Sequence, residues 1–301
     1  MVSLLGAATG IVLDRRFGEP PLEPHPLVVF GRVMRASEAR LWRDDRLAGV
    51  AHAAGGVGLG LVAGRVLGST ALATYLAVAG RALDQAAADV ERALAAGDLV
   101  AAREALPALV GRDPAGLGPS ELARAVVESL AENTVDAVVA PACWASVAGA
   151  PGALGYRAVN TLDAMVGHRS TRYERFGWAS ARLDDVANLV PARLTAVLVA
   201  TVRPSSAGAV WRAVRDDAPA HPSPNSGVAE AAFAAALGLR LGGPSRYGDR
   251  VEERPPLGTG RSAEPADIAA ARRLARDVAG AAALSLALLG AGTARRRRRA
   301  A

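Results

Sequence analysis

Residues 182–200 read RLDDVANLVPARLTAVLVA, so two adjacent aspartates lead directly into an almost uninterrupted apolar run. A carboxylate beside an apolar segment of this length is costly unless another group pairs with it. Helix capping can account for one of the two aspartates, but it cannot account for both Asp184 and Asp185. The stretch therefore predicts an apolar helix that carries a polar binding site at its start.

The composition lies between that of a soluble enzyme and that of a polytopic membrane protein. Hydrophobic residues make up 51% of the 301 residues, and the mean hydropathy is +0.19. All 35 basic residues are arginines, so any phosphate contact must come from arginine or from backbone amides. The single cysteine, Cys143, excludes internal disulfides and a zinc site built on several thiolates.

The C-terminal region favours a membrane protein. Residues 278–294 are uncharged and are followed by five arginines, Arg295 to Arg299. The length of this run just reaches the lower limit for a bilayer-spanning helix, and a basic cluster at its end is typical of a cytoplasmic tail. Nucleic-acid binding is the alternative, but it favours interleaved aromatic residues, and only 4% of the chain is aromatic. We therefore expect the lipid bilayer as a partner and no nucleic acid.

Further apolar segments support this interpretation, and they lie at 47–64, 66–80, 137–159 and 186–202. Pro141, Pro151 and Pro191 interrupt two of them, which favours kinked or re-entrant helices over plain spans. If every segment crossed the bilayer once, the polar blocks between them would alternate sides. We therefore expect at least one proline-broken segment to be re-entrant or to cross only half of the bilayer.

The predicted fold class is all-α, because no segment shows a convincing β-alternation. We expect a polytopic helical membrane protein of the cytoplasmic membrane, with about four to six hydrophobic helices, some kinked or re-entrant. The N-terminal apolar segment lacks a basic region and a cleavage site, which predicts a retained first helix. The chain is predicted to form one domain, 1–301, with 81–133 and 203–277 as extramembrane helices and loops and 295–301 as a cytoplasmic basic tail.

Glycines recur every four residues at Gly56, Gly60, Gly64 and Gly68. Small residues at this spacing let two helices approach closely in a membrane. The same region contains a Gly58-x-Gly60-x-x-Ala pattern of the dinucleotide-binding type, but no strand precedes it. The glycines therefore predict helix packing.

One group of carboxylates follows helical spacing. Glu128, Glu132 and Asp136 are four residues apart, so a helix would place them on one face. A solvated acidic face is the simpler interpretation of such a pattern. Because this helix runs into an apolar segment, a cation site is an equal alternative, and Mg²⁺ prefers such carboxylate ligands. The predicted metal ligands are therefore Glu128, Glu132, Asp136, Asp184 and Asp185.

Three further polar blocks flank the apolar runs, at 21–32, 160–188 and 221–244. The catalytic candidates are His25, Asp163, His168 and His221, although a structural hydrogen bond is the commoner role of a single histidine. Arginine, amide, hydroxyl and carboxylate groups could contact a phosphate-bearing substrate. Those candidates are Arg32, Asn133, Asn160, Arg169, Arg172, Tyr173, Arg182, Asn188, Ser223, Asn225 and Glu230. The arginines have an alternative role as anchors at the inner membrane face.

Four blocks, taken in order, resemble the cobinamide-phosphate synthase (CobD/CbiB) family of membrane proteins of cobalamin (vitamin B12) biosynthesis. They are LDRRFGEPPLEPHPLVVFGR, ESLAENTVDAVVAP, NTLDAMVGHRSTRYERFGWASARLDDVANLVPARLTA and HPSPNSGVAEAAFAAALGLRLGG. The third block is the most specific. The resemblance extends from about residue 10 to about residue 260, and it does not cover the 81–120 region or the basic tail.

The resemblance implies an ATP-dependent ligase. Members of this family join aminopropanol or its O-phosphate to the free carboxylate of adenosylcobyric acid, which gives an amide. The implied co-substrate is ATP and the implied metal is Mg²⁺, with no tightly bound organic cofactor. The implied partners are the corrinoid, the amine and other membrane enzymes of late cobalamin assembly. A non-catalytic membrane scaffold or carrier for corrinoid intermediates is the alternative.

Overall fold

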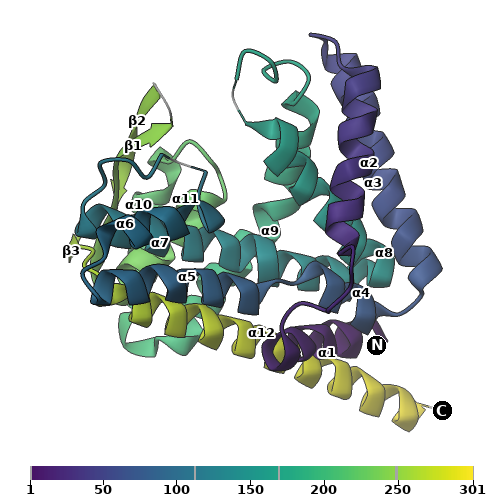
Figure 1. The fold of residues 1–301 in the computed structure, drawn as a ribbon. Coiled ribbons are helices and arrows are strands. Elements are labelled where there is room, and N and C mark those ends of the chain that lie inside the picture. Colours follow the sequence, from purple (N-terminus) through teal and green to yellow (C-terminus); the bar gives the residue numbers. More distant parts are fainter. Residues whose placement is uncertain (1, 112, 169, 248–249, 301) are drawn as a thin grey trace. The chain divides into compact units, whose positions relative to one another are not determined.

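The protein is described by a computed structural model that covers residues 2–111, 113–168, 170–247 and 250–300. The described chain is mainly helical, which confirms the predicted class (Figure 1). The α-helices are α1 (Val2–Phe17), α2 (Pro26–Leu41), α3 (Arg46–Leu67), α4 (Thr70–Ala77), α5 (Gly80–Ala95), α6 (Leu99–Ala105), α7 (Pro119–Thr134), α8 (Ala140–Leu162), α9 (Trp178–Val202), α10 (Ala207–Asp216), α11 (Ser226–Leu237) and α12 (Asp267–Ala300).

The chain divides into two compact units, each built from several segments of sequence. Unit 1 comprises Met1–Ala79, Asp136–Asn188 and Ala282–Ala301, and unit 2 comprises Gly80–Val135 and Leu189–Ala281. Two π-helical turns, Val135–Val139 and Asp163–Gly167, precede and follow α8. Short 3₁₀ turns connect other elements at Leu106–Ala108, Pro204–Ser206 and Ala218–Ala220.

Four helical segments of the described chain are long and apolar enough to cross a membrane. They are Arg46–Leu67, Pro119–Gly167, Trp178–Val202 and Asp267–Thr293. Large apolar side chains on these segments are exposed, among them Val66 at 82% and Leu288 at 64%. Exposed apolar faces of this kind mark contact with lipid or with another protein. The side chains of the predicted basic tail, 295–301, lie outside the described residues, and the cytoplasmic position of the tail stays a prediction.

Helix α8 reverses direction within a proline-interrupted segment, and the re-entry of this segment into a membrane stays a prediction. Gly149 has φ 67° and ψ −147°, outside the helical region, and Pro151 follows it. A Cβ on Gly152 would lie 2.1 Å from the carbonyl oxygen of Trp144, a contact that a straight helix cannot make. The two arms, 140–148 and 150–162, rise about 1.5 Å per residue. Taken by itself, neither arm reaches across a hydrocarbon core of about 30 Å, and the length of the apolar run Pro119–Gly167 comes from α7 and the two π-helical turns together with both arms.

The glycine ladder packs α3 against the second arm of α8 in unit 1. A Cβ on Gly56 would meet Leu162, one on Gly60 would meet Leu154, and one on Gly64 would meet Ala150. These three glycines confirm the predicted helix packing, in which missing side chains let two backbones approach. Gly68 does not belong to the ladder, because it is the left-handed C-cap of α3, with φ 68°.

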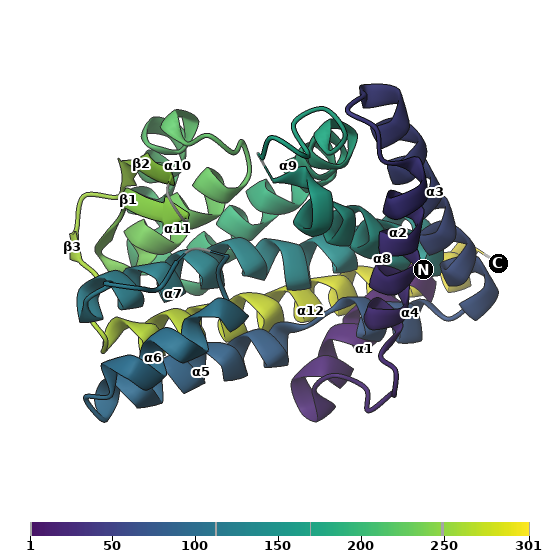
Figure 2. The same cartoon turned by 45° about the horizontal axis from the view of Figure 1, so that its top comes forward.

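Helices α1 and α4 of unit 1 also pack closely at glycines. Gly6 and Gly10 of α1 lie against Thr70 and Thr74 of α4, with distances from their ideal Cβ positions below 3 Å. Helix α4 has only 8 residues, too few to span a bilayer, so the predicted apolar segment 66–80 is not a separate crossing. Helices α2 and α3 run side by side in both views (Figures 1 and 2).

Unit 2 combines helices with a small sheet. Its strands are β1 (Leu239–Tyr247), β2 (Arg250–Leu257) and β3 (Arg261–Ser262), in the order β2-β1-β3. Strand β2 pairs antiparallel with β1, with a bulge between Leu241 and Gly243, and β3 pairs parallel with β1. Helix α11 packs on β1, and α5 and α6 lie together beside α7 (Figure 2).

The sheet corrects the all-α prediction for residues 239–262, which lie in the segment 203–277 that the sequence predicted as extramembrane helices and loops. The signal for these strands was weak, because prolines and glycines interrupt any alternation of apolar and polar residues. Leu239, Leu241 and Leu257 are nevertheless fully buried and form part of the core of unit 2. Burial of these three leucines, together with antiparallel pairing, outweighs the poor strand propensity of the glycines and prolines.

Replacing Gly60 with alanine is expected to lower the free energy of unfolding by about 1–3 kcal/mol. The reason is that its Cβ would lie 2.6 Å from the Leu154 carbonyl oxygen. Gly58 is the matched control on the same helix, since its Cβ would meet nothing within 4 Å. Alanine at 58 should be neutral or stabilising by up to about 1 kcal/mol, because it favours the helix. Thermal unfolding in one detergent measures both variants, and equal midpoints would contradict the packing described.

Candidate functional site

The reversal of α8 brings two carboxylates to one amide in unit 1. Asn160 Nδ2 donates a hydrogen bond to Asp136 Oδ2 at 3.2 Å and another to Asp184 Oδ1 at 3.4 Å. Asp136 lies before the first arm of the hairpin, Asn160 lies near the end of the second arm, and Asp184 belongs to α9. Three segments that are far apart in sequence therefore meet at the open end of the hairpin.

The network continues through neighbouring polar groups. Asn188 Nδ2 donates to Asp184 Oδ2 at 3.0 Å, and Tyr156 Oη donates to Asn188 Oδ1 at 2.9 Å. Arg157 Nη1 donates to Asn160 Oδ1 at 3.3 Å. Asn188 is 2% exposed and Tyr156 is 3% exposed, whereas Asp136, Asn160 and Asp184 are partly exposed, so the network has a buried end and an end that solvent can reach. At the buried end, a low-dielectric environment strengthens the electrostatic interactions. We call Asp136, Tyr156, Arg157, Asn160, Asp184 and Asn188 the hairpin network.

The local backbone supports a functional interpretation of this network. Asp136 lies in the π-helical turn Val135–Val139, and Asp163 lies in the second one, Asp163–Gly167. Isolated π-helical turns are rare and occur frequently at functional sites. A Cβ on Gly167 would lie 1.8 Å from Asp163 Oδ1, so only glycine leaves room for this carboxylate.

A second polar cluster of unit 1 joins the loop before α9 to α2. Arg172 donates to Glu38 Oε1 from Nη2 at 3.0 Å and from Nε at 3.3 Å, and the Tyr173 hydroxyl donates to the same oxygen at 2.8 Å. The Arg172 guanidinium also lies 4.6 Å from the ring centroid of Trp42. His168 packs edge-on against Tyr173 at 4.9 Å. The sequence predicted Arg172 and Tyr173 as substrate contacts but missed Glu38, whose only signal was its position on an amphipathic helix.

Other candidates of unit 1 have structural partners or are exposed. His25 Nδ1 accepts from the Leu27 amide and caps α2, which is the commoner role of a single histidine. Arg182 lies 3.3 Å from Asp185 in an ion pair on α9. Arg32 is exposed on α2. Arg169 lies outside the described residues. The hairpin network therefore includes Asp184 but not its neighbour Asp185.

Glu128 and Glu132 belong to unit 2, where both carboxylates have protein partners. Glu128 Oε1 accepts from the Gly242 amide at 2.9 Å, and Arg124 of the same helix donates to the Gly242 carbonyl. Glu132 Oε1 accepts from Ser226 Oγ at 2.7 Å, at the start of α11. Asn133 donates only to Ser129 on its own helix. Glu128 thus holds the β1 bulge, a role for which the sequence had no signal.

The block 221–230 forms a buried polar cluster in unit 2. Glu230 is fully buried, with His221 Nε2 at 3.8 Å and Arg254 Nη1 at 3.7 Å from its Oε1. The Ser223 amide donates to His221 Nδ1 at 3.0 Å. Asn225 Oδ1 accepts from Arg193 Nη1 at 3.0 Å. The sequence predicted His221, Ser223, Asn225 and Glu230 as site residues, but it did not predict Arg254, which is distant in the chain and comes from β2.

Several effects act on the pKa of His221, and the largest is burial, which lowers this pKa. The Ser223 backbone hydrogen bond and the charges of Glu132 and Glu128 act in the opposite direction, whereas Arg254 also lowers this pKa. The side chain is 4% exposed. The imidazole is therefore held in its neutral form near pH 7.

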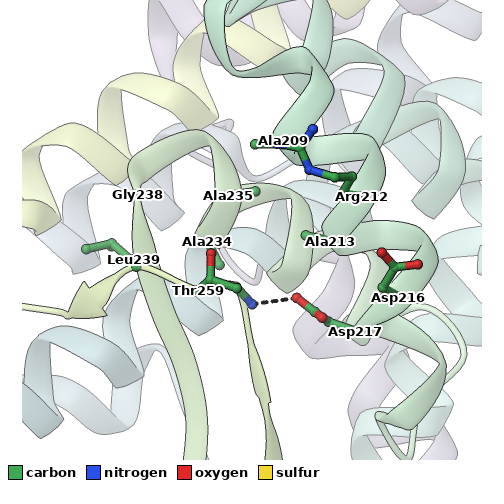
Figure 3. Close-up of a pocket in the computed structure, with 12 residues that line it drawn as sticks. Ala209, Arg212, Ala213, Asp216, Asp217, Ala234, Ala235, Gly238, Leu239 and Thr259 are labelled. Atoms are coloured by element: carbon green, nitrogen blue, oxygen red, sulfur yellow. Dashed lines mark hydrogen bonds between the residues drawn. The ribbon is translucent and has the colours of Figure 1, made fainter.

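The described residues of unit 2 line at least two cavities. The first, of about 350 Å³, is shown in Figure 3 and is lined by Arg212 and Asp216 from α10 and by Asp217, which follows that helix. Asp217 Oδ2 accepts from the Gly258 amide at 2.9 Å (Figure 3). The second, of about 450 Å³, lies between the first turn of α7 and the sheet. In the described residues, no group of three or more His, Cys, Asp or Glu side chains is arranged to hold a metal ion.

These features define a multi-pass helical membrane protein with a partly buried carboxylate–amide site at the open end of a helical hairpin. A family model described as CobD/Cbib protein matches residues 7–275, and the chain belongs to this family.

Relatives with high sequence identity extend over nearly the whole chain. A protein of Mycobacterium tuberculosis (strain ATCC 25618 / H37Rv), named Cobalamin biosynthesis protein CobD, is 50% identical, and the match covers 95% of each chain. Proteins of the same name from Geobacter metallireducens and Chromobacterium violaceum are 43% and 44% identical, with 93% and 91% of this chain covered and 93% and 92% of theirs. No solved structure matches.

His221 is expected to make stability depend on pH. Its pKa is lowered in the folded protein, so the unfolded chain binds the proton first as the pH falls. The stabilising contribution of the neutral imidazole is complete above about pH 6.5 and is lost as the pH falls towards the lowered pKa. His221→Gln should therefore show a smaller drop in melting temperature between pH 7.5 and pH 5 than the wild type. An unchanged drop would show that His221 does not titrate with folding.

Proposed function

We propose that this chain acts in cobalamin biosynthesis and forms an amide between the free carboxylate of adenosylcobyric acid and aminopropanol or its O-phosphate. Membership in the CobD/Cbib family and the names of its relatives support the pathway. One observation supports the chemistry, namely the hairpin network, in which Asp136 and Asp184 share the amide of Asn160. Paired carboxylates of this kind suit a cationic ligand.

The proposed reaction requires activation of an acid. A carboxylate does not react with an amine in neutral water, because oxide is a poor leaving group. Attack of a carboxylate oxygen on the γ-phosphorus of ATP breaks the bond to ADP and gives an acyl phosphate. The amine nitrogen then attacks the acyl carbon, phosphate leaves, and a base takes the proton from nitrogen. The products are the amide, ADP, phosphate and a proton.

The residues of the hairpin network fit Mg²⁺. Magnesium prefers oxygen ligands, commonly one or two carboxylates completed by water and phosphate oxygens. Asp136 and Asp184 are two carboxylates within hydrogen-bonding distance of one amide, and an amide also offers an oxygen. When bound, the ion would supply positive charge for the phosphate groups. Asp136 and Asp184 would hold it.

The amine is the second cation that these carboxylates could bind. An ammonium group donates three hydrogen bonds, and the two carboxylates already accept from the Asn160 NH₂ group. Of the histidines predicted as bases, His25 caps α2 and His221 belongs to unit 2. His168 therefore remains the candidate base in the unit that contains the hairpin network.

A non-catalytic scaffold for corrinoids is the alternative function. It requires corrinoid binding but no nucleotide turnover. Incubation of the detergent-solubilised protein with adenosylcobyric acid, Mg²⁺, ATP and either amine distinguishes the two. Mass spectrometry should detect a new amide that depends on ATP, with ADP formed in equal amount. Corrinoid binding without amide or ADP would favour the scaffold.

Asp184→Asn is expected to lower kcat by at least about 100-fold, because the loss of one carboxylate weakens the charge that holds the cation. Asp185→Asn is the matched control, since Asp185 pairs with Arg182 whereas Asp184 accepts from Asn160. We expect it to keep kcat within about threefold of wild type. Both variants should be compared by the mass-spectrometric assay after folding is checked. Equal losses, or full activity of Asp184→Asn, would contradict the assignment.

A further inference from the structure

The larger of the two cavities described above for unit 2 has arginines in its wall, and no residue of the hairpin network lines it. It measures about 450 Å³ and includes three arginines, Arg124 from α7, Arg240 from β1 and Arg254 from β2. Two acidic residues, Glu121 and Glu253, also line it. None of these five side chains belongs to the site residues predicted from the sequence.

Arg124 is held in place without being neutralised. Its guanidinium donates to the carbonyl of Gly242 and, at 2.7 Å, to the carbonyl of Pro244. Carbonyl oxygens orient a guanidinium but leave its charge uncompensated. In the described part of the chain Arg124 has no carboxylate within ion-pair distance, and the same holds for Arg240. A pre-oriented guanidinium loses little entropy when it binds an anion.

The remaining charged groups are balanced or exposed. Arg254 lies 3.7 Å from the buried carboxylate of Glu230, so its charge has a partner. Glu121 accepts from the Gly118 amide at 2.8 Å and so caps its own helix. Glu121 and Glu253 are both exposed, where water screens them, whereas Arg124 is half-buried. Arg240 is exposed as well, so the least-screened charge at the cavity without a carboxylate partner is that of Arg124, which is positive.

The glycines of β1 let a ligand in the cavity approach the strand backbone closely. Gly242 and Gly243 have φ 86° and 90°, which only glycine adopts easily. A Cβ on Gly242 would also lie 2.1 Å from the Pro255 carbonyl oxygen. Arg124 and Glu128 hold the carbonyl and the amide of Gly242 at the bulge. Bulges often stand beside binding sites, where they redirect side chains.

We propose that this cavity binds the phosphate group of an anionic ligand. Two guanidiniums with free donor groups match the tetrahedral dianion, which has more acceptor oxygens than a carboxylate. The first turn of α7, with Ser120, forms one wall, and its dipole favours an anion there. The volume exceeds that of phosphate alone, so the ligand is a phosphate ester. This site stands on the geometry of unit 2 and does not depend on the proposed ligation.

Direct binding to the full-length protein in detergent tests this inference without turnover. The three probes are inorganic phosphate, a non-hydrolysable ATP analogue and aminopropanol O-phosphate, each titrated by calorimetry without corrinoid. We expect at least one ester to bind more tightly than phosphate. Binding of only the nucleotide or only the amine phosphate would identify the source of the group.

Arg240→Gln should weaken binding of the tightest probe about tenfold, since it removes an exposed charge without disturbing the core. Glu253→Gln should strengthen binding two- to threefold at low salt. Arg212→Gln is the control, because Arg212 lines the other cavity beside Asp216 and Asp217. It should leave the Kd unchanged. Absence of binding by all three probes, an unchanged Kd in Arg240→Gln, or an equal loss in Arg212→Gln would overturn the proposal.

Discussion

The reversal of α8 at Gly149 is the constraint on which the candidate site depends. A left-handed glycine followed by Pro151 ends one short helix and starts another, and the two arms fold against each other. Only this reversal brings Asp136 to Asn160 across 24 residues. Without it, a straight helix would separate the two side chains by about 36 Å at 1.5 Å per residue. The polar network is therefore a consequence of a backbone feature, not of local side-chain preference.

The hairpin is stabilised by residues that take no part in the proposed reaction. Gly56, Gly60 and Gly64 let α3 approach the second arm until backbone and side-chain atoms touch. Lipid chains are as apolar as the helix surfaces, so the hydrophobic effect contributes little to helix association in a membrane. Close contact and dispersion must therefore hold such helices together. Trp144 adds a hydrogen bond from the first arm to the Ala187 carbonyl of α9. This bond ties the hairpin to the helix that supplies Asp184.

The sequence predicted this architecture where the signal is local. Apolar runs, prolines and the four-residue glycine spacing indicated membrane helices, a proline-broken segment and close packing, because each depends on residues near one another. It did not predict the three strands, since Gly242 and Pro255 obscure their alternation, nor Glu38 and Arg254, which become important only through partners far along the chain. Gly68 shows the same limit. The four-residue spacing is the same for Gly64, which packs against the second arm of α8, and for Gly68, which caps the C-terminus of α3.

Asp184 and Asp185 show that sequence spacing alone does not determine which of two adjacent aspartates joins the site, because tertiary contacts determine it. One turns towards Asn160 and Asn188, and the other pairs with Arg182 on the helix surface. The two residues are chemically identical and adjacent in the sequence. A helix turns about 100° per residue, however, so their side chains face different surroundings. Both carboxylates are partly exposed, so burial does not distinguish them, and the difference lies in the partner that each one meets. Asn160 and Asn188 donate to Asp184 through neutral amides, which suits this carboxylate to binding a cation, whereas the guanidinium of Arg182 balances the charge of Asp185.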